Sequence, residues 1–207
     1  MINDNTIERF LDNLASQSPT PGGGSVAAIM GAMGAALVSM VCHLTIGKPA
    51  YVAVDSDMRQ VLGEAENLRT QLADMVQADV TVFDQVMAAY RLPRETEADK
   101  AHRSTAIQTA LKAATEVPLA CAGLCLKVMQ LSQRVAEQGN PGVITDAGVA
   151  VVAALAALRS SELNVRVNAK NIRERDYADS RLGELDELLS RARTLESEVF
   201  QTVLNRL

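Results

Sequence analysis

A carboxylate on the apolar face of a long predicted helix is the first side chain that could do chemistry. Asp79 falls in phase with Met75, Phe83, Val86 and Tyr90, which recur at three- and four-residue intervals. Burying a lone charge is costly, so a carboxylate in such a row must be paired, neutral or used in a reaction. Asp79 is therefore a candidate catalytic residue.

Three other ionisable side chains are candidates, and two of them stand near predicted helix ends. Lys48 follows an apolar helix, where the helix dipole already favours a cation. Asp146 follows the loop 139–142, where it is either a helix cap or a catalytic carboxylate. Asp84 is offset from the apolar row that contains Asp79, so we expect it to be more exposed.

A glycine-rich loop precedes the most apolar part of the chain, and its residues are Pro19, Thr20, Pro21, Gly22, Gly23, Gly24 and Ser25. Three glycines before a helix leave backbone N–H groups open to a ligand, and the helix dipole adds positive potential. The loop lacks the Gly-Lys-Ser/Thr of a phosphate-binding loop. It is either a ligand-binding loop or a flexible connector, and Ser25 is expected to help cap the helix.

A polar stripe crosses a later helix where core residues would be expected. It consists of Ala157, Ser161, Asn164, Asn168 and Asn171, which share one helical face. Asparagine is a poor helix former, so three on one face lower helix stability. Side-chain amides both donate and accept, which suits the edge of a heterocycle. The alternative is a hydrated or inter-subunit polar seam.

No spacing in the sequence indicates a metal site. His43 and His102 are too few for a cluster, and Cys121 and Cys125 are not at a zinc or redox spacing. With Cys42 they make an odd count in apolar surroundings, which predicts reduced, buried thiols. We assign no metal and no cofactor.

The elements that position these residues are predicted to be helices throughout. Aromatic residues make up only 3% of the 207 residues and no useful strand pattern appears, so the sequence predicts an all-α bundle of six to seven helices, several very long, with a buried Gly/Ala-rich central helix. No linker divides residues 1–207, which form one domain. Such long helices favour a homodimer. The expected helices cover 6–15, 25–47, 55–92, 95–116, 118–138, 145–173 and 177–207.

Charge and composition exclude several classes of protein. The net charge of −5 does not suit a nucleic-acid binder. Residues 24–47 carry no Asp, Glu, Lys or Arg and are long enough to span a bilayer, but no aromatic belt flanks them and no second span is evident. We expect a helix buried in a soluble bundle instead. The first residues lack the pattern of a secretory signal, which predicts a cytoplasmic protein.

Several runs of the sequence carry a family resemblance, which spans nearly the whole chain. They are Ser18-Pro-Thr-Pro-Gly-Gly-Gly-Ser25, Leu44-Thr-Ile-Gly-Lys48, Phe83-Asp84, Glu116-Val-Pro-Leu119, Asp146-Ala-Gly-Val-Ala150 and Asn164-Val-Arg-Val-Asn168. Together they resemble the formiminotetrahydrofolate cyclodeaminases and the methenyltetrahydrofolate cyclohydrolases that share their fold. The resemblance implies an all-α dimer with a folate site lined by the glycine loop. His43 departs from the family, which more often has Asn there.

The resemblance implies one of two related reactions at the bridge carbon of tetrahydrofolate. A cyclohydrolase adds water to 5,10-methenyltetrahydrofolate and yields 10-formyltetrahydrofolate, whereas a cyclodeaminase closes the methenyl ring and releases ammonia. Both need a carboxylate near a cation, from Asp79 or Asp146, and a proton carrier such as Lys48. Lys48 is alternatively a ligand for the glutamyl carboxylate of folate.

We favour the cyclohydrolase, because the likeness is closest to stand-alone bacterial members. The cyclodeaminase is the runner-up, and a non-catalytic folate-binding module is the third alternative. The resemblance assigns substrate binding to Pro21, Gly22, Gly23, Gly24, Ser25, His43, Asp84, Asn164 and Asn168.

Overall fold

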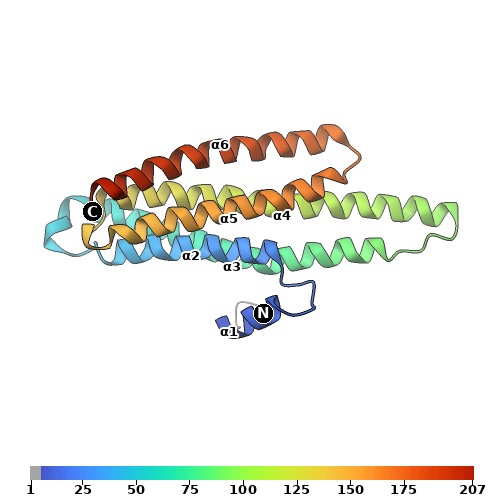
Figure 1. The fold of residues 1–207 in the computed structure, drawn as a ribbon, viewed down its shortest axis with the longest axis horizontal. Coiled ribbons are helices and arrows are strands. Elements are labelled where there is room, and N and C mark those ends of the chain that lie inside the picture. The colour runs from blue at the N-terminus through green and yellow to red at the C-terminus, as the bar shows by residue number, and fades with distance from the viewer. Residues whose placement is uncertain (1–5) are drawn as a thin grey trace.

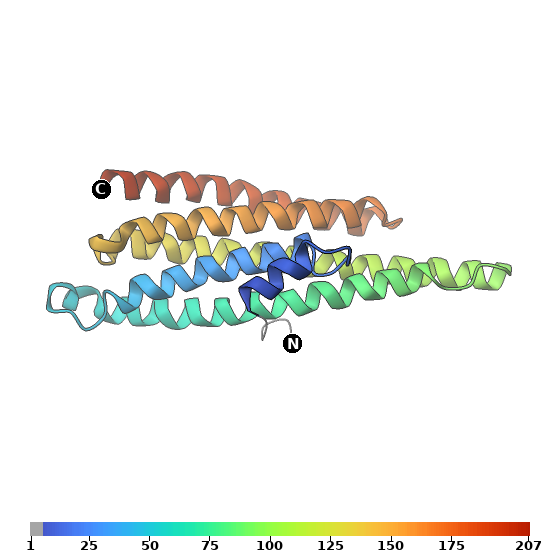
Figure 2. The ribbon, with the colours of Figure 1, turned by 60° about the horizontal axis from the view of Figure 1, so that its bottom comes forward.

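The computed structural model describes residues 6–207, and within that range it is helical with no strand. Five helices lie side by side along one axis, and the short first helix lies across one flank (Figures 1 and 2). The all-α prediction is confirmed. The helices are α1 (Ile7–Leu14), α2 (Gly23–His43), α3 (Asp55–Tyr90), α4 (Glu97–Gln138), α5 (Ile144–Lys170) and α6 (Arg175–Asn205), with 3-10 turns η2 (Pro49–Val54) and η3 (Pro141–Val143).

Small residues let α2, the predicted Gly/Ala-rich helix, pack closely against its neighbours. A Cβ at Gly31 would lie 2.9 Å from the Cys125 sulfur of α4, and one at Gly34 would lie 3.0 Å from the Ala150 carbonyl oxygen of α5. Side chains larger than hydrogen would push these helices apart. The shorter α2 begins at Gly23, and α3 and α4 continue well beyond its N-terminal end (Figure 1).

The sequence predicts a break at Pro118, and this prediction is wrong, because α4 is a single helix of 42 residues that contains this proline. Proline has no N–H, so it frees the carbonyl four residues earlier, which belongs to Ala114. The Asn168 amide on α5 donates to that carbonyl at 2.7 Å. A side chain of a neighbouring helix thus replaces the lost backbone hydrogen bond.

This pairing predicts that Asn168→Ala lowers the free energy of unfolding by about 1–3 kcal/mol, because a buried carbonyl loses its partner. In a Pro118→Ala background the residue 118 N–H can bond to Ala114, so the loss should be much smaller. Urea unfolding of the two single variants and the double variant measures both effects. Equal losses in the two backgrounds would contradict the pairing.

One face of α2 and one face of α5 expose apolar side chains. The exposed fraction is 58% for Met33 and 36% for Met40 on α2, and 55% for Val149 and 71% for Leu163 on α5. Only the opposite face of α2 is buried, so the predicted central helix is covered on one side. Monomeric soluble proteins rarely expose apolar patches of this extent.

Three segments of the described chain are long and apolar enough to cross a membrane, judged by length and composition alone: Gly23–His43, Glu97–Gln138 and Pro141–Lys170. The expectation of a single such segment is therefore wrong. Charged residues such as Lys127 and Arg159 interrupt the two later segments, so their apolar stretches are less evident in the sequence. In each helix about half of the apolar window is buried against other helices: 56%, 61% and 44%.

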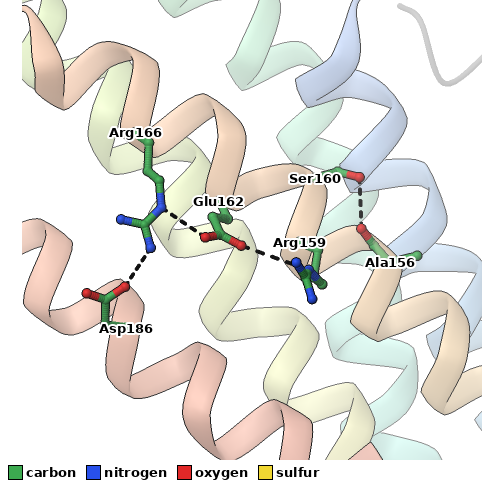
Figure 3. A network of polar contacts seen from close by, with 6 residues as sticks. All are labelled: Ala156, Arg159, Ser160, Glu162, Arg166 and Asp186. Atoms are coloured by element: carbon green, nitrogen blue, oxygen red, sulfur yellow. Dashed lines mark hydrogen bonds and ion pairs between the residues drawn. The ribbon is translucent and has the colours of Figure 1, made fainter.

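Ion pairs on the surface link α5 to α6 (Figure 3). Glu162 lies between Arg159 and Arg166, and Arg166 donates to Asp186 of α6 at 2.6 Å. Exposed pairs of this kind contribute little to stability. The hydrophobic contacts of α6, which come from the buried Leu185, Leu189 and Ala192, account for its position.

Candidate active site

The Asp79 carboxylate of α3 meets the first turn of α2. The Ser25 hydroxyl donates to Asp79 Oδ2 at 2.9 Å, and Ser25 itself is fully buried. Gly24 makes this approach possible, because a Cβ at that position would overlap both carboxylate oxygens. The glycine loop and the in-phase aspartate, which the sequence singles out separately, therefore form one cluster.

Burial and hydrogen bonding act on the Asp79 carboxyl in opposite directions. Burial raises its pKa above the ordinary value, and the hydroxyl and amide of Ser25 lower it by a smaller amount. The net result is a raised pKa. A carboxyl group of this kind takes up and releases a proton closer to neutral pH than an exposed aspartate does, which suits general acid–base chemistry.

The start of α2 differs from the sequence-based prediction. Ser25 was expected to cap this helix, but Gly22 is the N-cap residue and makes no side-chain hydrogen bond. Ser25 lies inside the first turn instead and directs its hydroxyl to α3. A carboxylate at a helix N-terminus interacts favourably with the helix dipole, so Asp79 takes the electrostatic role of the missing cap.

Two buried polar groups next to this cluster were not predicted as site residues. The contact with Cys125 lowers the pKa of the Cys121 thiol on α4, burial raises it, and smaller effects come from Ser161, which lowers it, and from the Asp79 charge, which raises it, so that the net direction is down. Ser161 on α5 is fully buried. The sequence placed Ser161 on the asparagine stripe, but nothing in it indicated that Cys121 of α4 lies beside Ser161.

The asparagine stripe of α5 becomes more exposed toward the end that α2 does not cover. Ser161 is buried, Asn164 and Asn168 are half-buried, and Asn171 is exposed. The Asn164 amide donates to the Ser160 carbonyl at 3.0 Å. Asn168 has the structural role described above. Asp84 is exposed on α3, as expected.

The remaining predicted residues lie at the opposite end of α2. His43 is 18 residues beyond Ser25, which corresponds to about 27 Å along the helix. Lys48 follows Gly47, a residue with φ of 74°, and both His43 and Lys48 are exposed. Within one chain, Lys48 therefore cannot reach the Asp79 cluster.

Asn140 organises this second end of the bundle. Its amide donates to the Leu44 carbonyl at 2.9 Å, and its oxygen accepts from the Tyr51 hydroxyl at 3.0 Å. Asp146 lies nearby in the first turn of α5 and is half-buried. The three predicted catalytic side chains thus form two groups, with Asp79 in one and Lys48 and Asp146 in the other.

Within residues 6–207, no three His, Cys, Asp or Glu side chains are arranged to hold a metal ion. The arrangement around Asp79 offers a titratable carboxyl, backbone N–H groups at a helix end, and amide side chains on a neighbouring helix. Such a set can bind a polar heterocycle and move protons at it.

The chain belongs to the formiminotransferase-cyclodeaminase family, whose model matches residues 6–187. It is 55% identical over 206 residues to the methenyltetrahydrofolate cyclohydrolase of Methylorubrum extorquens, covering 100% of this chain and 99% of that protein. The resemblance predicted from the sequence is confirmed.

Two further relatives are more distant. The rat formimidoyltransferase-cyclodeaminase is 31% identical over 191 residues, and the match covers 92% of this chain but only 35% of that protein. The crystal structure of formiminotetrahydrofolate cyclodeaminase from Thermotoga maritima superposes with a TM-score of 0.90 at 28% identity, covering 99% of this chain and 98% of that one.

Proposed function

We propose that this protein is a methenyltetrahydrofolate cyclohydrolase, which converts 5,10-methenyltetrahydrofolate and water to 10-formyltetrahydrofolate and a proton. The observation that carries this proposal is the 55% identity to a cyclohydrolase along essentially the whole of both chains. The buried, proton-binding carboxyl of Asp79 beside the glycine loop supports it chemically.

Asp79 is suited to both halves of this reaction. As a carboxylate it stabilises the cationic methenyl carbon and accepts a proton from the attacking water, which forms the new C–O bond. As a carboxylic acid it then returns that proton to the 5-nitrogen while the bond between carbon and this nitrogen breaks, and the hydroxyl group loses its proton to water as the formyl C=O bond forms. The formyl group remains on the 10-nitrogen, and the raised pKa makes both protonation states accessible.

The same geometry supports a position for the substrate beside Asp79. The N–H groups of Gly22, Gly23 and Gly24 lie at the positive end of α2, beside Asp79. Half-buried Asn164 lies on α5 on the helical face that it shares with buried Ser161, where an amide can meet a donor and acceptor edge of the pterin ring. The reaction needs no redox group, so we propose that the folate substrate is bound without a further cofactor.

The protein is further proposed to act as a cytoplasmic homodimer that binds neither nucleic acid nor membranes. The exposed apolar faces of α2 and α5 favour self-association. All three cysteines are free and buried, which is usual for a reducing compartment.

The test is to mix the purified protein with 5,10-methenyltetrahydrofolate and follow the loss of methenyl absorbance. We expect loss far above the uncatalysed rate, with 10-formyltetrahydrofolate as the product. No acceleration would contradict the proposal. Release of ammonia from 5-formiminotetrahydrofolate would then favour the cyclodeaminase, the class to which the Thermotoga maritima relative belongs. If neither reaction occurs, the non-catalytic folate-binding module is the remaining alternative.

A further inference from the structure

Positive charge gathers around one cavity of a chain whose net charge is −5. The cavity has a volume of about 310 Å³ and lies between the start of α4 and the turn that joins α5 to α6, and the tips of α3 and α4 extend beyond this turn (Figure 1). Its lining includes four cations and no acidic side chain, so it attracts anions although the protein as a whole is acidic. The polar residues of this cavity, here called the basic pocket, are Arg94, Lys100, Arg103, Ser104, Gln108 and Arg173.

Two arginines of the basic pocket are held in place by neutral acceptors. Arg103 donates to the carbonyl of Tyr90 at the end of α3 at 3.0 Å, and its guanidinium carbon lies 5.7 Å from the centre of the Tyr90 ring. The Arg173 guanidinium donates to the Ser104 hydroxyl at 2.6 Å, and its backbone N–H donates to the Gln108 side-chain oxygen at 2.7 Å. A carbonyl or a hydroxyl fixes a guanidinium without neutralising it, so both positive charges remain available to an anion.

The acidic side chains nearest in the sequence do not neutralise these arginines. Glu97 pairs with Lys100 at 2.6 Å, and Glu95 accepts from the backbone N–H of Arg94. Within residues 6–207, no ion pair joins a carboxylate to the guanidinium of any arginine that lines the basic pocket. An anion that enters the pocket therefore meets three unpaired guanidinium groups, each of which can offer parallel N–H donors to a carboxylate.

Rows of side chains extend from the Asp79 cluster toward the basic pocket. Asp79 and Tyr90 are 11 residues apart on α3, which places them on the same face and about 16 Å apart along the helix axis. Half-buried Phe83 lies between them in this row. On α5, the asparagine stripe ends at Asn171, two residues before Arg173. The basic pocket is therefore at the far end of the surface that begins at the proposed reaction centre.

The tail of the proposed substrate matches this order of side chains. Folate continues from its 10-nitrogen through a benzoyl ring to glutamate, and each further glutamate joined through a γ-carboxyl adds one carboxylate. An aromatic group followed by anions corresponds to Phe83 followed by the basic pocket. Lys48, which the sequence offered as a ligand for these carboxylates, lies at the opposite end of α2 within the chain.

We propose that the basic pocket binds the carboxylates of an oligo-γ-glutamyl tail on the folate substrate, with Arg94, Arg103 and Arg173 as the tail-binding residues. This inference rests on the proposed function. Four cations exceed the two carboxylates of a single glutamate, so the pocket favours tails of several glutamates. The tail is remote from the reacting carbon and keeps its contacts throughout the reaction, so these contacts lower KM and leave kcat unchanged.

Kinetics with monoglutamyl and pentaglutamyl 5,10-methenyltetrahydrofolate test the proposal. The wild-type KM should be roughly 10-fold lower for the pentaglutamate, which is the gain expected from two or three exposed ion pairs. In the double variant Arg94→Gln/Arg173→Gln, the two KM values should become nearly equal. The double variant Lys127→Gln/Arg193→Gln removes two exposed cations of α4 and α6 outside the basic pocket and should keep the wild-type ratio. Circular dichroism checks that each variant is folded.

Calorimetric titration with p-aminobenzoyl-pentaglutamate gives a readout that does not depend on the reaction, because this probe has the tail but no pterin. It should bind the wild type and the control variant, bind more weakly as salt is added, and lose most of its affinity for Arg94→Gln/Arg173→Gln. Citrate carries three carboxylates without the tail, and it should displace the probe only at much higher concentration. This comparison distinguishes a tail site from a site for any small polycarboxylate.

Three results would overturn the tail site. The first is equal wild-type KM values for the two substrates, and the second is an unchanged KM ratio in Arg94→Gln/Arg173→Gln. The third is displacement of the probe by citrate at a concentration similar to that of the probe itself. If the wild type lacks cyclohydrolase activity but the probe binds through the two arginines, the proposed reaction fails while the tail site stands.

Discussion

Asp79→Asn is expected to lower kcat for methenyltetrahydrofolate hydrolysis by ~100-fold or more, the usual scale for loss of a general acid–base group. Asparagine has nearly the same shape and still accepts a hydrogen bond from Ser25, but it cannot exchange a proton with the substrate. The assay is loss of methenyl absorbance at saturating substrate. Asp74→Asn, an exposed change on the same helix, is the matched control and should retain activity.

The same substitution should leave the fold intact and raise its stability at neutral pH. Burial raises the pKa of Asp79, so the folded state binds this proton more tightly than the unfolded state. Stability therefore falls as the pH rises from the ordinary aspartate pKa through the raised value. Asparagine removes that dependence.

Urea unfolding of wild type and Asp79→Asn across pH measures this difference. The gain in the free energy of unfolding of the variant should be greatest at neutral pH. It should disappear in acid, where Asp79 is protonated in both the folded and the unfolded wild type. Near-normal turnover of Asp79→Asn would exclude Asp79 from the mechanism. If the stability of the variant relative to wild type is lower at neutral pH than in acid, the direction of the pKa shift is contradicted.

Helical periodicity was sufficient to find the main features of the fold and of the Asp79 cluster. Asp79 shares its phase with Met75 and Phe83, and a position in that row is half-buried in any bundle. The Gly/Ala-rich sequence of α2 likewise predicted a buried helix, and Gly31 and Gly34 lie close against α4 and α5. These inferences depend only on which face a residue occupies.

Contacts between helices could not be derived in this way. Pro118 ends a helix by local rules, and only the Asn168 amide from α5 explains why α4 continues. Neither residue suggests the other in the sequence. The opposite positions of Asp79 and Lys48 were equally hidden, because motifs that recur together in a family need not lie together in one chain.

Gly24→Ala should reduce turnover nearly as much as loss of Asp79, although alanine is the better helix former. The added Cβ would occupy the space of the Asp79 carboxylate, so this group must rotate away from Ser25 or α2 must move from α3. We expect ~100-fold lower kcat and a loss of about 1–3 kcal/mol in the free energy of unfolding.

Gly63→Ala is the matched control, because a Cβ at this exposed position of α3 meets no other atom within 4 Å. It should keep full activity and gain roughly 0.5–1 kcal/mol of stability from helix propensity. We expect Gly24→Ala to lower turnover by displacing the Asp79 carboxylate. The double variant with Asp79→Asn should then turn over no more slowly than Asp79→Asn alone. If the fold-losses in kcat of the two single variants multiply in the double variant, Gly24 instead acts on the substrate directly, through the backbone at the start of α2.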